Sequence, residues 1–444
     1  MSVDQAVFQQ FRTSIGQLGE TAAPNDVPRE QWVQRAKEVF IDKLDARMAV
    51  DLECCIHCGM CAEACHFYEA TENPKYTPIH KLELLRRVYR RELSPMRWLY
   101  RPFTREIEAD ELEDYQELVF DACTECGRCD MMCPMGIQLS SMVHVTRQAL
   151  AHAGLAPAEL RVIEQEQSNS GTIFGAGPEQ LMAVVEEIRA LGIDVPVDKE
   201  KATIMLLSTA PEVLLFKDAL AATARILNKL GLDWTLRSGC FEAANFGEMA
   251  GHESAQKLVT KRITDEAIAC GASTVIVPEC GNAYPALRFD GANVLGMVLP
   301  FEVMAISEFI GRELDAGRLQ LTNGASGQKV TYHDPCKIGR RGGVYEQPRN
   351  ALKAMGAELI ETDSNRRENY CCGGGAGGFL INRAAPLRQK AFEIKQRQFD
   401  DTGADAVVTA CASCRLNFMI GAENAGWSTP VQSLVEMVAA NLAD

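Results

Sequence analysis

Short apolar runs alternate with longer amphipathic runs in the second half of the chain. The apolar runs are rich in β-branched residues and too short for helices, so they predict buried strands. They span residues 202–208, 273–279, 328–334 and 405–410. The runs 219–231 and 386–403 instead have apolar residues at the helical period. Strands that alternate with helices favour parallel sheets, so we expect α/β domains in this half.

Two stretches of this half match each other, which indicates an internal duplication. Residues 224–234 resemble 349–359, and residues 267–280 resemble 399–411. We therefore predict two copies of one α/β domain. The predicted copies span residues 201–325 and 326–444, after a linker and helix at residues 165–200.

The two copies differ in their cysteines. Those of the second copy are Cys336, Cys371, Cys372, Cys411 and Cys414. The first copy keeps two cysteines. Cys240 aligns with Cys372, and Cys280 lies one residue from the position that aligns with Cys411. A domain duplication, followed by loss of most of these cysteines from the first copy, explains this pattern. Cys270 has no counterpart, and we expect it to be structural.

The first half of the chain contains two cysteine runs with the same C-x2-C-x2-C-x3-C spacing. They are Cys55, Cys58, Cys61 and Cys65, and then Cys123, Cys126, Cys129 and Cys133 before Pro134. Such closely spaced thiolates hold three corners of a [4Fe–4S] cubane, and the fourth ligand comes from the other run. We therefore predict one cluster on the first three cysteines with Cys133. We predict a second on Cys123, Cys126 and Cys129 with Cys65.

Structural zinc is the alternative for these runs. Zinc sites usually combine two separated C-x2-C pairs, so two runs of four cysteines favour iron–sulfur clusters instead. Cys54 is left over, and we expect it to be a small buried apolar residue.

A basic segment separates the two runs. Residues 81–92 have the apolar spacing of a helix, and Lys81 to Arg105 includes eight basic residues with Trp98, Tyr100 and Phe103 among them. Two interpretations stay open. The segment is either a solvated helix face or a docking patch for a partner protein or a membrane surface.

Overall charge and hydropathy limit the possible partners. The formal net charge is −15, which argues against nucleic acid as a partner. No uncharged apolar run reaches 18 residues, and the N-terminus lacks the layout of a signal peptide. We expect a cytoplasmic protein, with any membrane contact on the cytoplasmic face made through a partner.

The second copy resembles a known family of iron–sulfur proteins. The resemblance is to the cysteine-rich CCG domain. It rests on three motifs, at residues 332–340, 370–378 and 410–414, and on the gaps of 34 and 38 residues between their cysteines. Paired cluster runs followed by two such domains resemble the D subunit of heterodisulfide reductase. Similar proteins are the K subunit of the sulfite-reductase-associated membrane complex and the iron–sulfur subunits of glycolate oxidase and anaerobic glycerol-3-phosphate dehydrogenase. His66 favours the heterodisulfide branch, because glycolate-oxidase-type subunits typically have proline there.

The resemblance implies an α+β multidomain architecture. A helical extension (1–46) and a helical two-cluster ferredoxin domain (47–164) would precede the degenerate and the complete CCG domain. It further implies that the five cysteines of the second copy bind a noncubane [4Fe–4S] cluster and are catalytic. Gly373, Gly374 and Gly375 would let the backbone close over this cofactor. Four polar residues flank Cys336, and we expect turn capping or hydrogen bonding to cluster sulfur from them rather than proton delivery. They are His333, Asp334, Lys337 and Arg340, with His333 also expected to contact the cofactor.

The resemblance implies an iron–sulfur oxidoreductase subunit of a complex. Electrons would pass between a membrane cytochrome b-type or soluble flavoprotein partner and the noncubane cluster. That cluster would act on a thiol or disulfide of a small molecule or protein. The alternative is an electron-transfer subunit of a flavin-dependent 2-hydroxy-acid or glycerol-3-phosphate dehydrogenase feeding the quinone pool. Its flavin would lie on another chain, because no dinucleotide fingerprint is present here. A scaffold or redox sensor with structural clusters is the third possibility.

Overall fold

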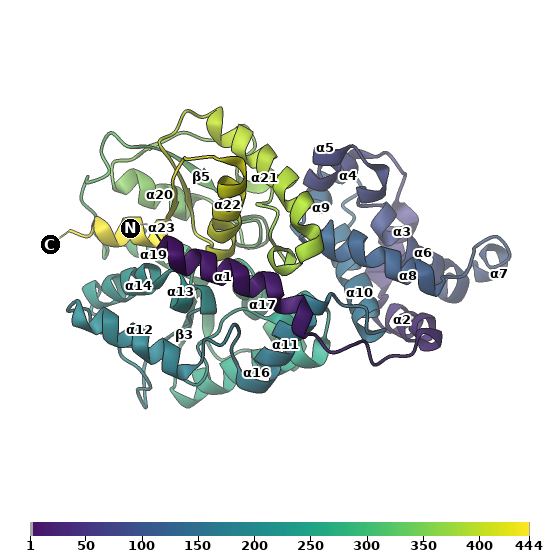
Figure 1. The fold of residues 1–444 in the computed structure, drawn as a ribbon, viewed down its shortest axis with the longest axis horizontal. Coiled ribbons are helices and arrows are strands. Elements are labelled where there is room, and N and C mark those ends of the chain that lie inside the picture. The colour runs from purple at the N-terminus through teal and green to yellow at the C-terminus, as the bar shows by residue number, and fades with distance from the viewer. Residues whose placement is uncertain (1–2, 444) are drawn as a thin grey trace.

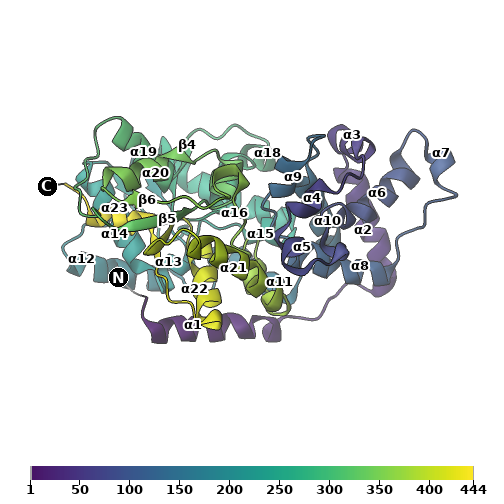
Figure 2. The same ribbon diagram turned by 90° about the horizontal axis from the view of Figure 1, so that it is seen from above.

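The computed structural model describes residues 3–443, which form a helical part at one end and two α/β domains at the other (Figure 1). The two α/β domains lie against each other, and the helical part contacts both of them (Figures 1 and 2). This arrangement confirms the fold class predicted from the sequence.

The helical part is built around two long helices, α2 and α10. They pack together through small and aromatic side chains that include the fully buried Ala36, Phe40 and Ala149. The helices of this part are α2 (Arg29–Lys43), α3 (Ala46–Cys54), α4 (Met60–Glu63), α5 (His66–Thr71), α6 (Glu83–Val88), α7 (Arg97–Tyr100), α8 (Ala109–Gln116), α9 (Arg128–Met132), α10 (Leu139–His152) and α11 (Ala158–Ser170).

The N-terminal extension is divided between the two ends of the molecule. Helix α1 (Gln5–Gln17) lies along the α/β domains near α22, whereas α2 belongs to the helical part (Figures 1 and 2). Arg12 forms an ion pair with Glu423, and the side-chain amide of Asn382 donates to the Gly16 carbonyl over 2.7 Å. The extension therefore bridges the two ends of the molecule.

The first α/β domain contains a four-stranded parallel sheet in the order β2-β1-β3-β4. Its strands are β1 (Ile204–Leu206), β2 (Trp234–Thr235), β3 (Thr274–Val277) and β4 (Glu302–Ala305). Its helices are α12 (Pro178–Ala190), α13 (Ala210–Leu214), α14 (Lys217–Lys229), α15 (Phe246–Ala250), α16 (Glu253–Ala269), α17 (Ala283–Arg288), α18 (Gly291–Leu295) and α19 (Ile306–Asp315).

The second α/β domain repeats this topology with the parallel order β6-β5-β7-β8. Its strands are β5 (Lys329–His333), β6 (Glu358–Leu359), β7 (Ala406–Thr409) and β8 (Val431–Ser433). Its helices are α20 (Glu346–Ala354), α21 (Ala385–Asp400), α22 (Ala412–Ala425) and α23 (Leu434–Ala440). The four apolar runs predicted as buried strands contain β1, β3, β5 and β7.

Strand register aligns the two copies residue by residue. Ile204 pairs with Thr274 in the first sheet as Val330 pairs with Ala406 in the second. Counting onward from these pairs gives the equivalent positions at the strand ends. They are Ala210 for Cys336, Glu279 for Cys411 and Asn282 for Cys414.

The polar segment predicted as the start of a linker is partly helical. Helix α11 continues to Ser170 and ends at Gly171, whose φ of +82° suits glycine. Gln167 is buried on this helix, where its amide donates to the Ala244 carbonyl and accepts from the Phe246 N–H. The polar residues of α11 therefore hold the helical part against the first α/β domain.

A fully buried arginine joins all three parts of the molecule. The Arg147 guanidinium on α10 donates to the carbonyls of Val119 and Cys123 in the helical part, over 2.7 Å each. It also donates to Met249 in the first α/β domain and Ala376 in the second, over 3.1 and 3.0 Å. One side chain thus fixes the cysteine loops of different domains relative to one another.

Among residues 3–443, none of the helices has the length and apolar character needed to span a bilayer.

Candidate iron–sulfur sites

The first group of thiols combines residues from both cysteine runs. Cys55, Cys58, Cys61 and Cys133 line one small pocket, and Cys58 is exposed at its rim. Helix α3 ends just before this loop, and Cys133 follows α9. The structure therefore places together the four cysteines that the sequence assigned to one cubane.

The second group mirrors the first. Cys65 lines a pocket with Cys123, Cys126 and Cys129. The two loops have the same backbone turn, with left-handed φ angles at the residue before the second cysteine (His57, Glu125) and at the glycine after it (Gly59, Gly127). This turn directs closely spaced thiols toward one centre, as a cubane requires.

A lysine lies beside the second group. The Lys81 ammonium is fully buried and lies 3.9 Å from the Cys65 sulfur. Burial alone would lower the pKa of Lys81, but the thiols of Cys65 and Cys123 outweigh it and raise the pKa. Lys81 is therefore a cation that faces the thiols. In the sequence, Lys81 belongs to the basic segment between the cysteine runs. Only the structure shows that it is buried beside the thiols.

The third group gathers at the carboxyl ends of two neighbouring parallel strands. Cys336 follows β5, Cys411 follows β7, and Cys414 lies in the first turn of α22. The Cys371–Cys372 pair comes from the glycine-rich loop, where the Cys371 sulfur lies 3.9 Å from that of Cys336. All five thiols are buried and pack in one cluster.

The glycine-rich loop makes contacts that larger residues would prevent. Gly373 has a φ of +93°, and a Cβ on Gly374 would lie 2.9 Å from the Asn417 side chain. A Cβ on Gly375 would lie 3.1 Å from the carbonyl oxygen of Thr124, in the second cysteine run. The loop of the third group therefore packs directly against the loop of the second.

His333 lies beside the third group and carries an N–H that is unpaired within the part of the chain that the structure describes. The Lys395 ammonium donates to the Asn369 side-chain oxygen over 2.8 Å, so the Asn369 amide nitrogen faces the other way, toward the Asp334 carbonyl (2.7 Å) and His333 Nδ1 (3.5 Å). Nδ1 then accepts, and Nε2 carries the proton. Burial and the Lys395 charge hold the pKa of His333 well below its usual value, so the ring is neutral.

No protein group among residues 3–443 accepts from His333 Nε2. The ligand atoms of His333, Cys372 and Cys414 all lie within 4.8 Å of one another. A buried donor without an acceptor beside thiols fits a group that brings sulfur acceptors.

The other polar residues around Cys336 hold the loops in place. The Asp334 carboxylate pairs with both terminal nitrogens of the Arg349 guanidinium, over 2.7 and 2.8 Å. Arg340 donates to the Cys126 carbonyl over 2.7 Å and thereby links the second and third groups. Both contacts join loops around the third group to the rest of the molecule.

A cavity of about 870 Å³ opens beside these loops, between the helical part and both α/β domains. Cys126 and Cys336 line it. Lys337 in its wall lies 3.2 Å from Glu248 and 3.7 Å from Glu125. Burial opposes ionisation of Glu125, but Arg147, His144 and Lys337 outweigh it and hold the pKa of Glu125 well below its usual value.

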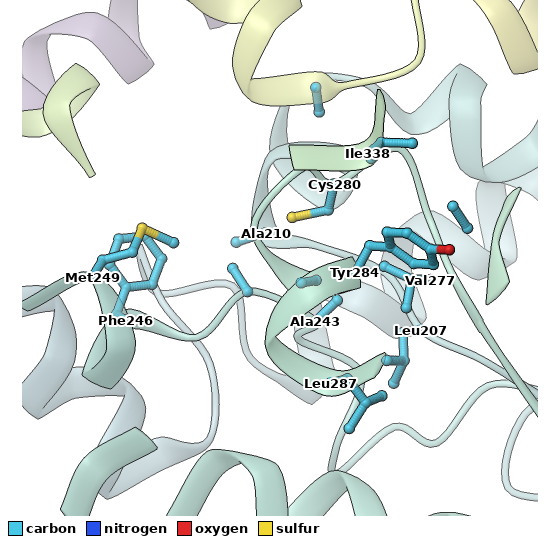
Figure 3. Close-up of a cluster of buried hydrophobic side chains, with 14 of the residues drawn as sticks. Leu207, Ala210, Ala243, Phe246, Met249, Val277, Cys280, Tyr284, Leu287 and Ile338 are labelled. Atoms are coloured by element: carbon cyan, nitrogen blue, oxygen red, sulfur yellow. The ribbon is translucent and has the colours of Figure 1, made fainter. Parts of the chain in front are cut away.

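The first α/β domain lacks a comparable group of thiols. Ala210 and Cys280 belong to a cluster of apolar side chains that also includes Ile338 of the second domain (Figure 3). Cys240 has Glu266 as its main charged neighbour, whereas that of Cys280 is Cys411. Burial raises the pKa of Cys240 to about 12. The two remaining cysteines thus face different surroundings.

Two family models match the chain. A 4Fe-4S dicluster domain matches residues 51–137, and a cysteine-rich domain (CCG) matches residues 330–419. These ranges contain the first two groups of thiols and the third group, respectively.

Curated relatives match over nearly the whole chain. The D subunit of dihydromethanophenazine:CoB--CoM heterodisulfide reductase of Methanosarcina acetivorans is 28% identical, with 91% of this chain and 98% of the relative covered. The chain is therefore similar to the iron–sulfur subunits of heterodisulfide reductases over most of its length. The Hdr-like menaquinol oxidoreductase iron-sulfur subunit 2 of Archaeoglobus fulgidus is 24% identical, with 91% of this chain and 82% of the relative covered. EtfAB:quinone oxidoreductase of Syntrophomonas wolfei is 27% identical, with 88% and 58% covered.

These matches support an oxidoreductase with iron–sulfur clusters and an electron-transfer role for this chain. They also support a role alongside a redox partner.

Proposed function

We propose that this heterodisulfide-reductase-like chain exchanges electrons between a redox partner and a thiol or disulfide substrate. Two cubane clusters on the first two groups of thiols would carry single electrons. A noncubane [4Fe–4S] cluster on the third group would be the terminus. Its proposed ligands are Cys336, Cys371, Cys372, Cys411 and Cys414.

One observation carries the proposal: five buried thiols gather in one cluster, and His333, whose Nε2 is buried and unpaired among the described residues, lies beside Cys372 and Cys414. The glycine-rich loop leaves the backbone bare beside this site. When bound, the noncubane cluster would supply one-electron redox chemistry and iron that can bind substrate sulfur. The protein holds the thiols in place and excludes water, and the His333 N–H, unpaired within residues 3–443, would be a donor for cluster sulfur.

The contacts between loops support the order of electron transfer. Cys58 of the first group is exposed, whereas the five thiols of the third group are buried. The second group lies between them, because it shares its cysteine runs with the first and touches the third through Thr124 and Gly375. Electrons from a partner would enter at the first group and reach the third through the second.

The large cavity supports a small polar substrate. A disulfide substrate would take up two electrons and two protons at the terminus and leave as two thiols. Because substrate enters and products leave, the terminus needs a path to solvent. Cys336 lines both the cluster site and the cavity of about 870 Å³, a volume typical of small-molecule sites. The cavity wall carries charges of both signs, because Lys337 pairs with Glu248 and Arg341 with Asp290, so a polar substrate would meet these ion pairs.

Electron paramagnetic resonance on anaerobically purified protein tests this proposal. Small thiols added under oxidising conditions should produce a new paramagnetic signal. The signal should be lost in Cys372→Ser and retained in Cys270→Ser, a matched change at a buried cysteine outside the three groups. A spectrum that does not respond to thiols, with all clusters present, would refute the thiol substrate.

A second candidate is electron transfer to or from a quinone-linked partner without a sulfur substrate. Relatives named menaquinol oxidoreductase and EtfAB:quinone oxidoreductase favour it. The partner would be a membrane protein of the cytochrome b type or a soluble flavoprotein. The thiol experiment separates the two candidates, because only the first requires a thiol-dependent signal.

A further inference from the structure

We propose that the chain itself docks on an anionic membrane surface through the loop 95–103, here called the tip. The tip contains α7 and projects from the outer end of the helical part, away from both α/β domains (Figures 1 and 2). It is a separate feature from the iron–sulfur sites, and the inference does not depend on the proposed substrate.

Large apolar side chains of the tip face solvent. Phe103 is 86% exposed and Trp98 is 75% exposed. Met96 and Leu99 beside them are 45% and 39% exposed. Four exposed apolar side chains within eight residues are unusual on a soluble surface, and such a concentration marks a candidate interaction site.

The tip is a structured loop rather than a loose connection. Arg91 at its base donates to the carbonyls of Arg101 (3.0 Å) and Thr104, and it forms an ion pair with Glu106. Arg97 donates to the Glu92 carbonyl over 3.3 Å. The fold therefore holds these apolar side chains in water, which is unfavourable. A binding partner that covered them would remove this unfavourable exposure.

In the part of the chain that the structure describes, the basic side chains of the tip lack the carboxylate partners that most other basic residues of the segment have. Lys81 is buried, and Arg86, Arg87, Arg91 and Arg105 form ion pairs with carboxylates. The other three arginines, Arg90, Arg97 and Arg101, form no ion pair with a carboxylate among residues 3–443. The tip sequence from Pro95 to Phe103 contains no acidic residue.

A bilayer surface fits this combination better than a protein groove. Tryptophan and phenylalanine settle at the boundary between headgroups and acyl chains, and arginine binds anionic headgroups. The tip is convex, so a soft surface can accept it. The net charge of −15 opposes approach over long distances, but charges beyond about 8 Å are screened at physiological ionic strength, so the local arginines dominate.

Docking at the tip would bring the first group of thiols toward the membrane. Helix α6 leads into the tip, and Arg86 on it lies 3.0 Å from His57 Nε2, in the loop between Cys55 and Cys58. Electrons could then enter from a carrier held in the membrane.

Vesicle sedimentation with the cluster-loaded protein tests the inference. We expect binding to vesicles of phosphatidylcholine with phosphatidylglycerol, with a blue shift of tryptophan emission. Trp98→Ser with Phe103→Ser should weaken binding at least about tenfold. The matched control is Val298→Ser, which changes an apolar side chain equally exposed (86%) on the first α/β domain.

A second pair of variants tests the charges. Arg97→Glu with Arg101→Glu should weaken binding about tenfold or more, and Arg97→Lys with Arg101→Lys should retain it. Absence of binding would overturn the proposal. Equal binding to phosphatidylcholine alone, or equal loss in the Val298→Ser control, would also overturn it. Unchanged cluster absorbance would show that each variant is folded.

Discussion

At the scale of single residues, the buried His333 is the side chain that we expect to tune the proposed noncubane cluster. Its orientation is fixed by the Lys395–Asn369 hydrogen bond on one side and by edge-to-face packing on the Phe418 ring, 4.7 Å away, on the other. The neutral ring can then donate only from Nε2. A hydrogen bond to cluster sulfur stabilises the more negative, reduced state and raises the reduction potential.

His333→Phe should therefore lower the reduction potential of the noncubane cluster. The ring shape is kept and the N–H is lost, so we expect a fall of about 50–100 mV, corresponding to one hydrogen bond of about 1–2 kcal/mol. A redox titration followed by electron paramagnetic resonance measures it. His152→Phe, at an exposed histidine of α10, is the control and should leave the potential unchanged. An equal potential in wild type and His333→Phe would show that the N–H does not reach the cluster.

At the scale of secondary-structure elements, one of the equivalent strand-end positions carries a thiol in the second α/β domain and a carboxyl group in the first. Glu279 occupies the position of Cys411, and Glu212 and Glu242 are buried nearby in the same domain. Burial raises the pKa of Glu212 and Glu279 to about 8 and that of Glu242 to about 7. These neutral carboxyl groups fill space at the strand ends of the first domain.

Glu212→Gln should change how stability depends on pH. The pKa of Glu212 is about 8 in the folded state and 4.5 in the unfolded state, so the folded state binds the extra proton. The free energy of unfolding should therefore fall as pH rises from about 4.5 through 8, and the variant should lack this contribution. Above pH 8 the variant should be more stable by on the order of 2–4 kcal/mol, and below pH 4.5 nearly equal.

Urea unfolding of the anaerobic protein at several pH values measures this difference. The control Glu187→Gln changes an exposed carboxylate that pairs with Lys217. It should not alter the pH dependence in this window. A constant difference between wild type and Glu212→Gln from pH 5 to 9 would contradict a buried neutral carboxyl group.

The sequence predicted these elements well because the signals were local. Short β-branched runs marked β1, β3, β5 and β7, and the duplication followed from matching segments. The strand register then explains the one-residue offset of Cys280, because Glu279 takes the equivalent position. Contacts between distant segments were not predictable. Lys81 beside Cys65 depends on packing within the helical part, and Gly375 against Thr124 depends on packing between domains; no local pattern encodes either contact.

At the scale of the whole molecule, domain packing places the second group of thiols between the first and the third. Arg147 ties the Cys123 carbonyl to the Ala376 carbonyl through one guanidinium, and Arg340 ties the Cys126 carbonyl to the third group. The second and third groups are therefore held at a fixed separation, which electron transfer between them requires. We accordingly expect three clusters to occupy the three groups.

Iron and acid-labile sulfide per chain test that expectation most directly. We expect about twelve irons in the anaerobically purified protein, four for each of two cubanes and one noncubane cluster. A variant with Cys336, Cys372 and Cys411 all replaced by alanine should retain about eight irons and the cubane signals. Equal iron content in both proteins would contradict a cluster in the third group.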